Sequence, residues 1–194
     1  MKRLLGLSVV VLLMSAFTLA AQEKTTPLYP LKVGNKWTYK VSGGSIEVAV
    51  EKKEKFNDEE CYKLETKSQG KVSAFEHVVV KTDGVYRTGV NGQKPDAPIL
   101  FLKLPATKAE KWDVKTKVQG QDVEGGFVIK EEDVTVPAGT YKGATLVEGA
   151  SFKIAGMETT LKVWFAKDIG IVKLEFKLGG QDATLELEKF EAGK

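Results

Sequence analysis

The sequence contains one thiol and one imidazole, which together could serve as a catalytic nucleophile and its base. The chain has 194 residues with one cysteine, Cys61, and one histidine, His77. A reactive thiolate needs an accessible, electropositive setting and a base, which His77 would have to provide. Free cysteine, however, is among the most buried residue types, and His77 lies within 75–80, a run typical of a β-strand. We expect an inert, buried Cys61, a His77 that belongs to a sheet, and no catalytic residue.

Acidic side chains gather at 58–60 and at 131–133. A calcium loop needs oxygen ligands at set intervals around a glycine turn, and neither cluster has this spacing. The sequence also lacks the Cys and His spacing of zinc sites, the glycine-rich loop that binds phosphate, and the serine elbow of hydrolases. We expect no metal and no cofactor. Two carboxylates from distant strands would form a glycosidase-type pair, and this alternative stays open.

The first residues have the pattern of a secretory signal peptide. A basic start precedes the apolar run 4–14, and small residues follow up to Ala20 and Ala21. A charged start, an apolar core of about 7–15 residues and a small-residue cleavage site are typical of exported proteins, whereas a membrane anchor needs about 20 apolar residues. We expect a signal peptide at 1–21, cleaved after Ala20 or Ala21. The mature protein would have no transmembrane span and would be periplasmic or extracellular.

The charge balance argues against a nucleic-acid partner. The whole chain carries 29 basic and 26 acidic side chains, a net charge of +3. Loss of Lys2 and Arg3 with the signal peptide lowers the net charge to +1 and leaves Arg87 as the single arginine. Nucleic-acid binders concentrate positive charge and use arginine to contact phosphates and bases. We expect no nucleic-acid partner.

Apolar and polar residues alternate through the rest of the chain. In 171–178 apolar side chains occupy every second position with charged ones between them, and 46–51 and 184–188 follow the same rule. This period of two predicts strands with one wet face. We predict an all-β fold, a curved antiparallel sheet of about 10–13 strands, either a half-barrel or a two-sheet sandwich. Turn dipeptides that tolerate positive φ separate the runs: Gly43-Gly44, Asp83-Gly84, Asn91-Gly92 and Gly179-Gly180.

A stretch with three of the six prolines, 91–111, divides the chain. Proline cannot donate a ladder hydrogen bond, so this stretch predicts a connector or an edge segment. We expect its apolar run, 99–102, to pack across an open end of the sheet.

The two flanking parts resemble each other weakly. The matching segments are 30–37 with 105–112, and 80–87 with 166–173. We predict one domain, 22–194, with pseudo-repeats at about 28–92 and 103–190 that superpose strand for strand. Coincidence among similarly patterned strands is the alternative.

Three motifs resemble a group of uncharacterised secreted bacterial β-proteins. They are LYPLKVGNKWTY at 28–39, VPAGTY at 136–141 and WFAKDIGIVK at 164–173. The group is similar, more distantly, to the curved β-sheet cups of periplasmic lipoprotein carriers. This resemblance implies a fold and points only indirectly to ligand binding, because fold does not determine function.

The motifs also have a direct physical interpretation. Pro137 and Gly139 predict a turn, and Gly170 predicts a bulge or a close approach of the backbone. Tryptophans dominate core energetics, so we expect the three of them to be core residues rather than a ligand platform.

The sequence favours an exported, non-catalytic β-protein that binds an apolar small molecule or lipid, or an envelope protein, in the concavity of its sheet. An envelope structural or assembly protein is the alternative, and a hydrolase with a carboxylate site is a weaker one. An outer-membrane barrel shares the alternation, but lysine is abundant and long loops are missing. The interior of the sheet decides between these functions, depending on whether it is solid, hollow and apolar, or hollow and polar.

Overall fold

The computed structural model describes residues 25–194, so the expected signal peptide and its cleavage site lie outside the described residues. This part of the chain consists of twelve β-strands with turns and loops between them. Within it, no helix has the length and apolar character to cross a membrane. The strands are β1 (Lys36–Val41), β2 (Gly44–Phe56), β3 (Glu59–Ser68), β4 (Lys71–Val80), β5 (Gly84–Val90), β6 (Ile99–Lys103), β7 (Lys111–Val118), β8 (Gln121–Val136), β9 (Gly139–Ile154), β10 (Met157–Ala166), β11 (Gly170–Leu178) and β12 (Gln181–Glu191).

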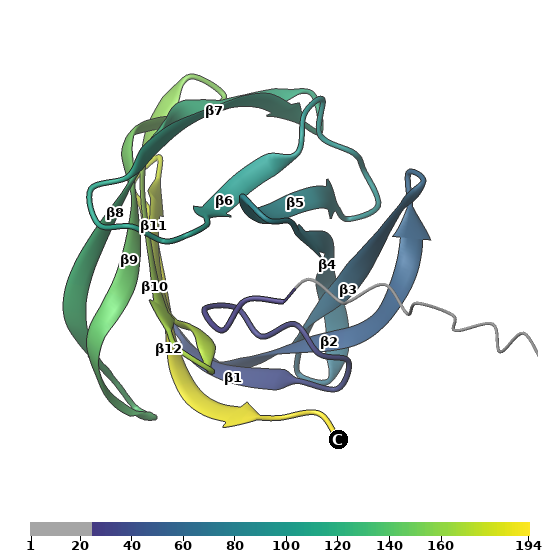
Figure 1. Ribbon diagram of the computed structural model, residues 1–194, viewed down its shortest axis with the longest axis vertical. Coiled ribbons are helices and arrows are strands. Elements are labelled where there is room, and N and C mark those ends of the chain that lie inside the picture. The colour runs from purple at the N-terminus through teal and green to yellow at the C-terminus, as the bar shows by residue number, and fades with distance from the viewer. Residues whose placement is uncertain (1–24) are drawn as a thin grey trace, which may run out of the picture.

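All twelve strands belong to one antiparallel sheet. Its order is β6-β5-β4-β3-β2-β1-β12-β11-β10-β9-β8-β7, so neighbours in the sheet are also neighbours in the chain, except for β1 and β12. The β1–β12 ladder runs from Lys36 opposite Glu191 to Lys40 opposite Glu186 and joins the two halves. The sheet curls into a ring (Figure 1). The all-β prediction and the predicted number of strands are confirmed, and of the two architectures the chain adopts the single curved sheet.

The edge strands β6 and β7 meet at a seam that side chains close. The indole N–H of Trp112 donates a 2.8 Å hydrogen bond to the carbonyl oxygen of Leu100. Thr116 Oγ1 accepts from the N–H of Ala97 at 2.8 Å and donates to its carbonyl oxygen at 2.9 Å. The proline-rich stretch therefore contains an edge strand, as predicted. Its apolar run 99–102 lies within β6 itself, rather than packing across an open end, because it pairs with β5.

The two halves of the chain have the same strand order. β1–β6 and β7–β12 are each a six-stranded meander, and Trp37 and Trp112 occupy the second positions of β1 and β7. Both indoles donate to a backbone carbonyl, Trp37 to that of Ile169 at 2.6 Å. Strand-for-strand superposition of 28–92 and 103–190 within one domain stays a prediction.

Alternation gives the sheet an apolar inner face and a charged outer face. In β11, Leu174 and Phe176 point into the ring, where they border its interior. Lys173 and Glu175, at the positions between, form an ion pair with 2.8 Å between Nζ and Oε1. The faces follow from the strand period of two, because successive side chains point to opposite sides.

One end of the ring is closed by the segment that precedes β1. A meander places the turns that follow even-numbered strands at one end, together with the segment 25–35. Tyr29 and Leu31 of this segment are buried. The Tyr29 ring lies 5.9 Å from the ring of Trp37 and 6.1 Å from that of Phe165. Aromatic packing therefore fills the ring at this end, and the turns after odd-numbered strands surround the other end.

Two glycines of the sequence motifs have the conformations predicted for them. Gly170 has a φ of +99°, and a Cβ there would lie 3.2 Å from the Tyr29 ring and 3.3 Å from Trp37 Nε1. The predicted close approach is confirmed. Gly139 has a φ of +140° at the start of β9, directly after the turn that the VPAGTY motif predicts.

Candidate ligand-binding site

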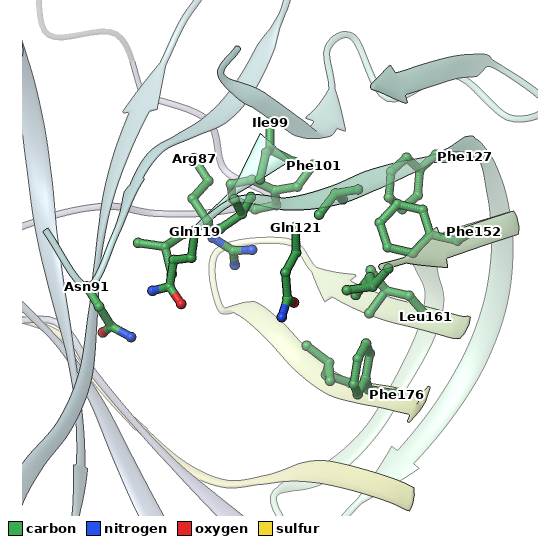
Figure 2. A pocket seen from close by; sticks show the side chains of 15 residues that line it. Arg87, Asn91, Ile99, Phe101, Gln119, Gln121, Phe127, Phe152, Leu161 and Phe176 are labelled. Atoms are coloured by element: carbon green, nitrogen blue, oxygen red, sulfur yellow. The ribbon is translucent and has the colours of Figure 1, made fainter. Parts of the chain in front are cut away.

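The inward side chains leave a hollow of about 410 Å³ toward the end of the ring opposite the Tyr29 packing. Three phenylalanines and Leu161 lie along one side of it (Figure 2). Protein interiors normally hold few voids larger than a water molecule, whereas small-molecule sites measure about 300–1,000 Å³. The hollow has the size and apolar lining of a ligand site. It is lined by Arg87, Val90, Asn91, Ile99, Phe101, Val118, Gln119, Gln121, Val123, Phe127, Phe152, Ile154, Leu161, Leu174 and Phe176.

A second hollow of about 320 Å³ adjoins the first. The two share Arg87, Val90, Asn91 and Leu174, so they are adjacent parts of one interior. The second hollow also borders Tyr29. The interior therefore extends from the open end to the aromatic packing at the closed end.

Glu76 on β4 and Arg87 on β5 form an ion pair inside the ring, in which Arg87 Nε donates to Glu76 Oε2. The Arg87 side chain is 37% exposed although it lies within the sheet, because it faces the hollow (Figure 2). Its guanidinium carbon lies 5.5 Å from the centroid of the Phe101 ring. Burial disfavours the charge on Arg87, but the adjacent Glu76 carboxylate outweighs this and raises the pKa of Arg87. The guanidinium therefore stays charged.

Two tyrosines border the second hollow near this ion pair. Burial, followed by the negative charge of Glu76, raises the pKa of Tyr29 far above its usual value. Burial likewise raises the pKa of Tyr39, whose hydroxyl donates a 2.9 Å hydrogen bond to the carbonyl oxygen of Ile171. Both phenols are neutral at physiological pH, so they add no charge to the interior.

Amide side chains surround the open end of the hollow. Gln119 lies in the turn between β7 and β8, Gln121 is the first residue of β8, and Asn91 follows β5. Figure 2 shows Asn91 and Gln119 on the side away from Phe127, Phe152 and Phe176, and Gln121 between the two groups. Asn91 Oδ1 accepts a 2.9 Å hydrogen bond from the backbone N–H of Phe75, which holds the side chain at the rim. The hollow thus has a polar rim and an apolar wall, the usual arrangement of a small-molecule pocket.

Cys61 and His77 lie outside this interior, on the opposite face of the sheet. Cys61 is 1% exposed, and its thiol contacts the carbonyl oxygen of Glu59 and the hydroxyl of Thr88 rather than the His77 ring. Burial raises the pKa of the Cys61 thiol, which disfavours the reactive thiolate. The burial of Cys61 is confirmed.

His77 is a sheet residue, as predicted. Its ring stacks on Phe56 with centroids 4.0 Å apart, and its Nε2 lies 3.0 Å from Glu54 Oε1. These contacts with two residues of β2 hold the His77 ring in place.

The two acidic clusters of the sequence lie at separate places in the fold, one at a turn and one on a strand. Residues 58–60 lie at the turn between β2 and β3, and residues 131–133 are exposed on β8. Asp133 accepts from Lys142 Nζ at 2.6 Å and from the N–H of Gly143 at 2.9 Å, which lowers its pKa. Over residues 25–194, no three His, Cys, Asp or Glu side chains are grouped so that they could hold a metal ion.

The tryptophans are core residues, as predicted: Trp37, Trp112 and Trp164 are 1%, 9% and 4% exposed. In the described part of the chain they lie outside the lining of both hollows. The rings that border the first hollow are phenylalanines instead.

Sequence reasoning missed Glu76 and Arg87 as site residues. A signal was present, because Glu76 shares the inward parity of Val78 and Val80 in β4. A charged residue at an apolar position of an alternating strand indicates a buried or cavity-facing charge. The partner of Glu76 was harder to identify, because a bulge shifts the β4–β5 register between His77 and Val78.

Comparison with known proteins agrees with the motifs. Residues 89–177 match the profile of a family described as DUF3108-like. This stretch contains the VPAGTY and WFAKDIGIVK motifs, and the match confirms the resemblance to an uncharacterised β-protein family. No curated protein matches the chain.

Two solved structures resemble the chain. One, described as a candidate lipoprotein of Parabacteroides distasonis, has a TM-score of 0.50 at 14% identity and covers 87% of this chain and 100% of its own. The other, described as a candidate exported protein with a YmcC-like fold from Bacteroides fragilis, has a TM-score of 0.44 at 12% identity and covers 84% of this chain and 98% of its own. At 14% identity, the likeness to the first shows a shared fold alone.

Proposed function

We propose that this chain is an exported, non-catalytic β-protein that holds an apolar ligand in the hollow of its curved sheet. The observation that carries the proposal is the 410 Å³ hollow with a wall of phenylalanines and a polar rim. The side chains that line an apolar cavity lack the dispersion contacts that a filled core would give them, and a bound ligand restores these contacts. The side chains best suited to this role are Phe127, Phe152, Leu161 and Phe176.

Export is supported by the signal-peptide pattern of 1–21. The test is the N-terminal sequence of the protein recovered from the envelope fraction of its own cell. A chain that begins at Ala21 or Gln22 agrees with the proposal, and one that retains the initial segment in the cytoplasm contradicts it. Comparison of the periplasmic fraction with the culture medium then distinguishes the two locations.

Ligand binding is tested with N-phenyl-1-naphthylamine, an uncharged dye that fluoresces in apolar surroundings. We expect the purified protein to bind the dye at a single saturable site. Leu161→Trp places a larger ring in the hollow and should weaken dye binding at least about tenfold. Thr160→Trp is the matched control, because Thr160 precedes Leu161 on the same strand and its side chain is exposed. Equal binding by the two variants would place the dye elsewhere.

The natural occupant is tested by native mass spectrometry of protein purified from its own envelope, followed by solvent extraction. An apolar molecule bound one to one supports the proposal. Protein that is empty and binds no dye contradicts it and favours a structural or assembly role in the envelope. The two adjoining hollows do not favour a two-carboxylate hydrolase, because Glu76 is the single carboxylate among the described residues that line these two.

A further inference from the structure

The charges of the interior limit the kind of ligand that it can hold. Glu76 and Arg87 are the two charged residues among the described residues that line the two adjoining hollows, and together they carry no net charge. An ion pair that is partly exposed or buried contributes little to stability compared with apolar residues of the same size. Its presence in an otherwise apolar wall therefore points to a use other than folding, namely contact with an occupant.

The ion pair leaves both donors and an acceptor available to an occupant. An arginine has five N–H donors, and the contact with Glu76 uses the one at Nε. The terminal nitrogens of Arg87 remain at the hollow, where the side chain is 37% exposed. Glu76 contributes Oε2 to the pair and is itself 25% exposed, which leaves Oε1 as an acceptor.

An ionic head group does not suit this pair. A ligand carboxylate on Arg87 would lie close to the Glu76 carboxylate, and two like charges in a poorly solvated interior repel strongly. A ligand cation on Glu76 would meet the guanidinium in the same way. An uncharged head group with a carbonyl acceptor for Arg87 and a hydroxyl donor for Glu76 satisfies both residues without this cost.

We propose that the occupant is an uncharged single-chain lipid that bears both an ester carbonyl and a hydroxyl, the chemistry of a monoacylglycerol. Its head contacts Glu76 and Arg87, and its chain lies along Phe127, Phe152 and Phe176. The volume of the first hollow is near the lower end of the range for ligand sites, which fits one chain rather than several. This inference rests on the proposed function, because it requires that the hollow binds a ligand.

The test compares three lipids with the same twelve-carbon chain, each below its micelle concentration: monolauroylglycerol, laurate and dodecyltrimethylammonium. Each competes with N-phenyl-1-naphthylamine for the wild-type protein near neutral pH. We expect monolauroylglycerol to bind at least about tenfold more tightly than either ion, since a like-charge contact readily costs a factor of this size. A wild-type protein that prefers laurate overturns the inference.

Glu76→Gln sharpens the test, because it keeps the size of the side chain and removes its charge. Arg87 is then unpaired, so laurate should gain at least about tenfold while monolauroylglycerol changes less than about threefold. Glu65→Gln is the matched control: Glu65 pairs with Lys63 on the outer face, at 2.8 Å, and its loss should leave the ratio of the two affinities unchanged. An unchanged ratio in Glu76→Gln also contradicts the inference.

The outcomes separate this inference from the proposed function. If the dye and all three lipids fail to bind, both are wrong. If the lipids bind without a preference for the uncharged one, the hollow is a ligand site but the assignment of its occupant is wrong. Should Glu76→Gln lose its native circular dichroism, the double variant Glu76→Gln with Arg87→Gln removes both charges. The preference for monolauroylglycerol over laurate should then shrink, because the repulsion by Glu76 is gone and only the desolvation of the laurate carboxylate remains.

Discussion

Trp112 closes the seam of the sheet by donating its indole N–H to the carbonyl oxygen of Leu100 at 2.8 Å. The two residues lie on β7 and β6, the edge strands that the ladder leaves unpaired with each other. Unpaired edges attract other strands, and natural sheets usually cover them. In this protein a buried aromatic side chain does so, at the position that corresponds to Trp37 in the other half.

Replacement of Trp112 by phenylalanine should weaken this seam. The carbonyl of Leu100 loses its partner, which we expect to cost about 1–3 kcal/mol in the free energy of unfolding. Urea denaturation measures the loss, and amide hydrogen exchange should accelerate selectively in β6 and β7. Trp37→Phe is the control, because it removes the bond to Ile169 at the other position and should leave exchange at the seam unchanged. Uniform exchange in both variants would contradict this role for Trp112.

Substitution of Gly170 by alanine should destabilise the closed end. The φ of +99° disfavours a side chain, and the new Cβ would press on Tyr29 and on Trp37 Nε1. We expect a loss of about 2–3 kcal/mol on thermal or urea unfolding. Gly180→Ala is the matched control, since Gly180 has a φ of +80° with no atom within 4 Å of the added Cβ. It should lose only about 1–2 kcal/mol, the conformational cost. Equal losses would show that the close approach is unimportant.

The stability of the protein should fall steeply at alkaline pH. Burial raises the pKa of Tyr29 and Tyr39 above the ordinary value of 10.0, and burial together with Asp83 raises that of Tyr86 to about 12. Because the folded pKa is raised, the stabilisation is fully present below about pH 10 and is lost as the pH rises toward the folded values. Each tyrosine contributes a slope of about 1.4 kcal/mol per pH unit in this window.

The check is urea unfolding at several pH values between about 9 and 12. Tyr29→Phe should reduce the slope of the unfolding free energy against pH by the contribution of one tyrosine, about 1.4 kcal/mol per pH unit. A slope that is the same in the variant and the wild type would mean that Tyr29 ionises without unfolding.

Cys61 should react slowly in the native protein. Its side chain is 1% exposed and burial raises its pKa, so alkylation by iodoacetamide requires local opening of the sheet. We expect a rate at least about tenfold below that of the urea-unfolded chain at the same pH. Cys61→Ser should leave dye and lipid binding intact, because the thiol lies outside the hollow. Rapid alkylation of the folded protein, or loss of binding in a folded Cys61→Ser variant, would contradict these expectations.

Much of the fold follows from local patterns. The parity of 171–178 separates Leu174 and Phe176 from Lys173 and Glu175, and the structure places the two sets on opposite faces. The turn dipeptides likewise mark the ends of strands. These features are readable because the strand period and the turn conformations depend on residues close in sequence.

The candidate site was harder to predict from the sequence, because it depends on residues that are far apart in the chain. A solid interior and a hollow one have the same alternating pattern, since each inward position is apolar in both. Glu76 has an inward position in the sequence, but whether its neighbour is solvent, a packed core or Arg87 depends on the register of β4 with β5, which a bulge shifts.

The sequence by itself determined the strands, their wet and dry faces and the turns between them, because these depend on interactions over a few residues. The tertiary structure alone decided that β1 pairs with β12, that Trp112 closes the remaining seam, and that the interior stays hollow around Glu76 and Arg87. These features depend on the curvature of the whole sheet and on side chains that meet from strands far apart in the chain. Local alternation carries no information about either.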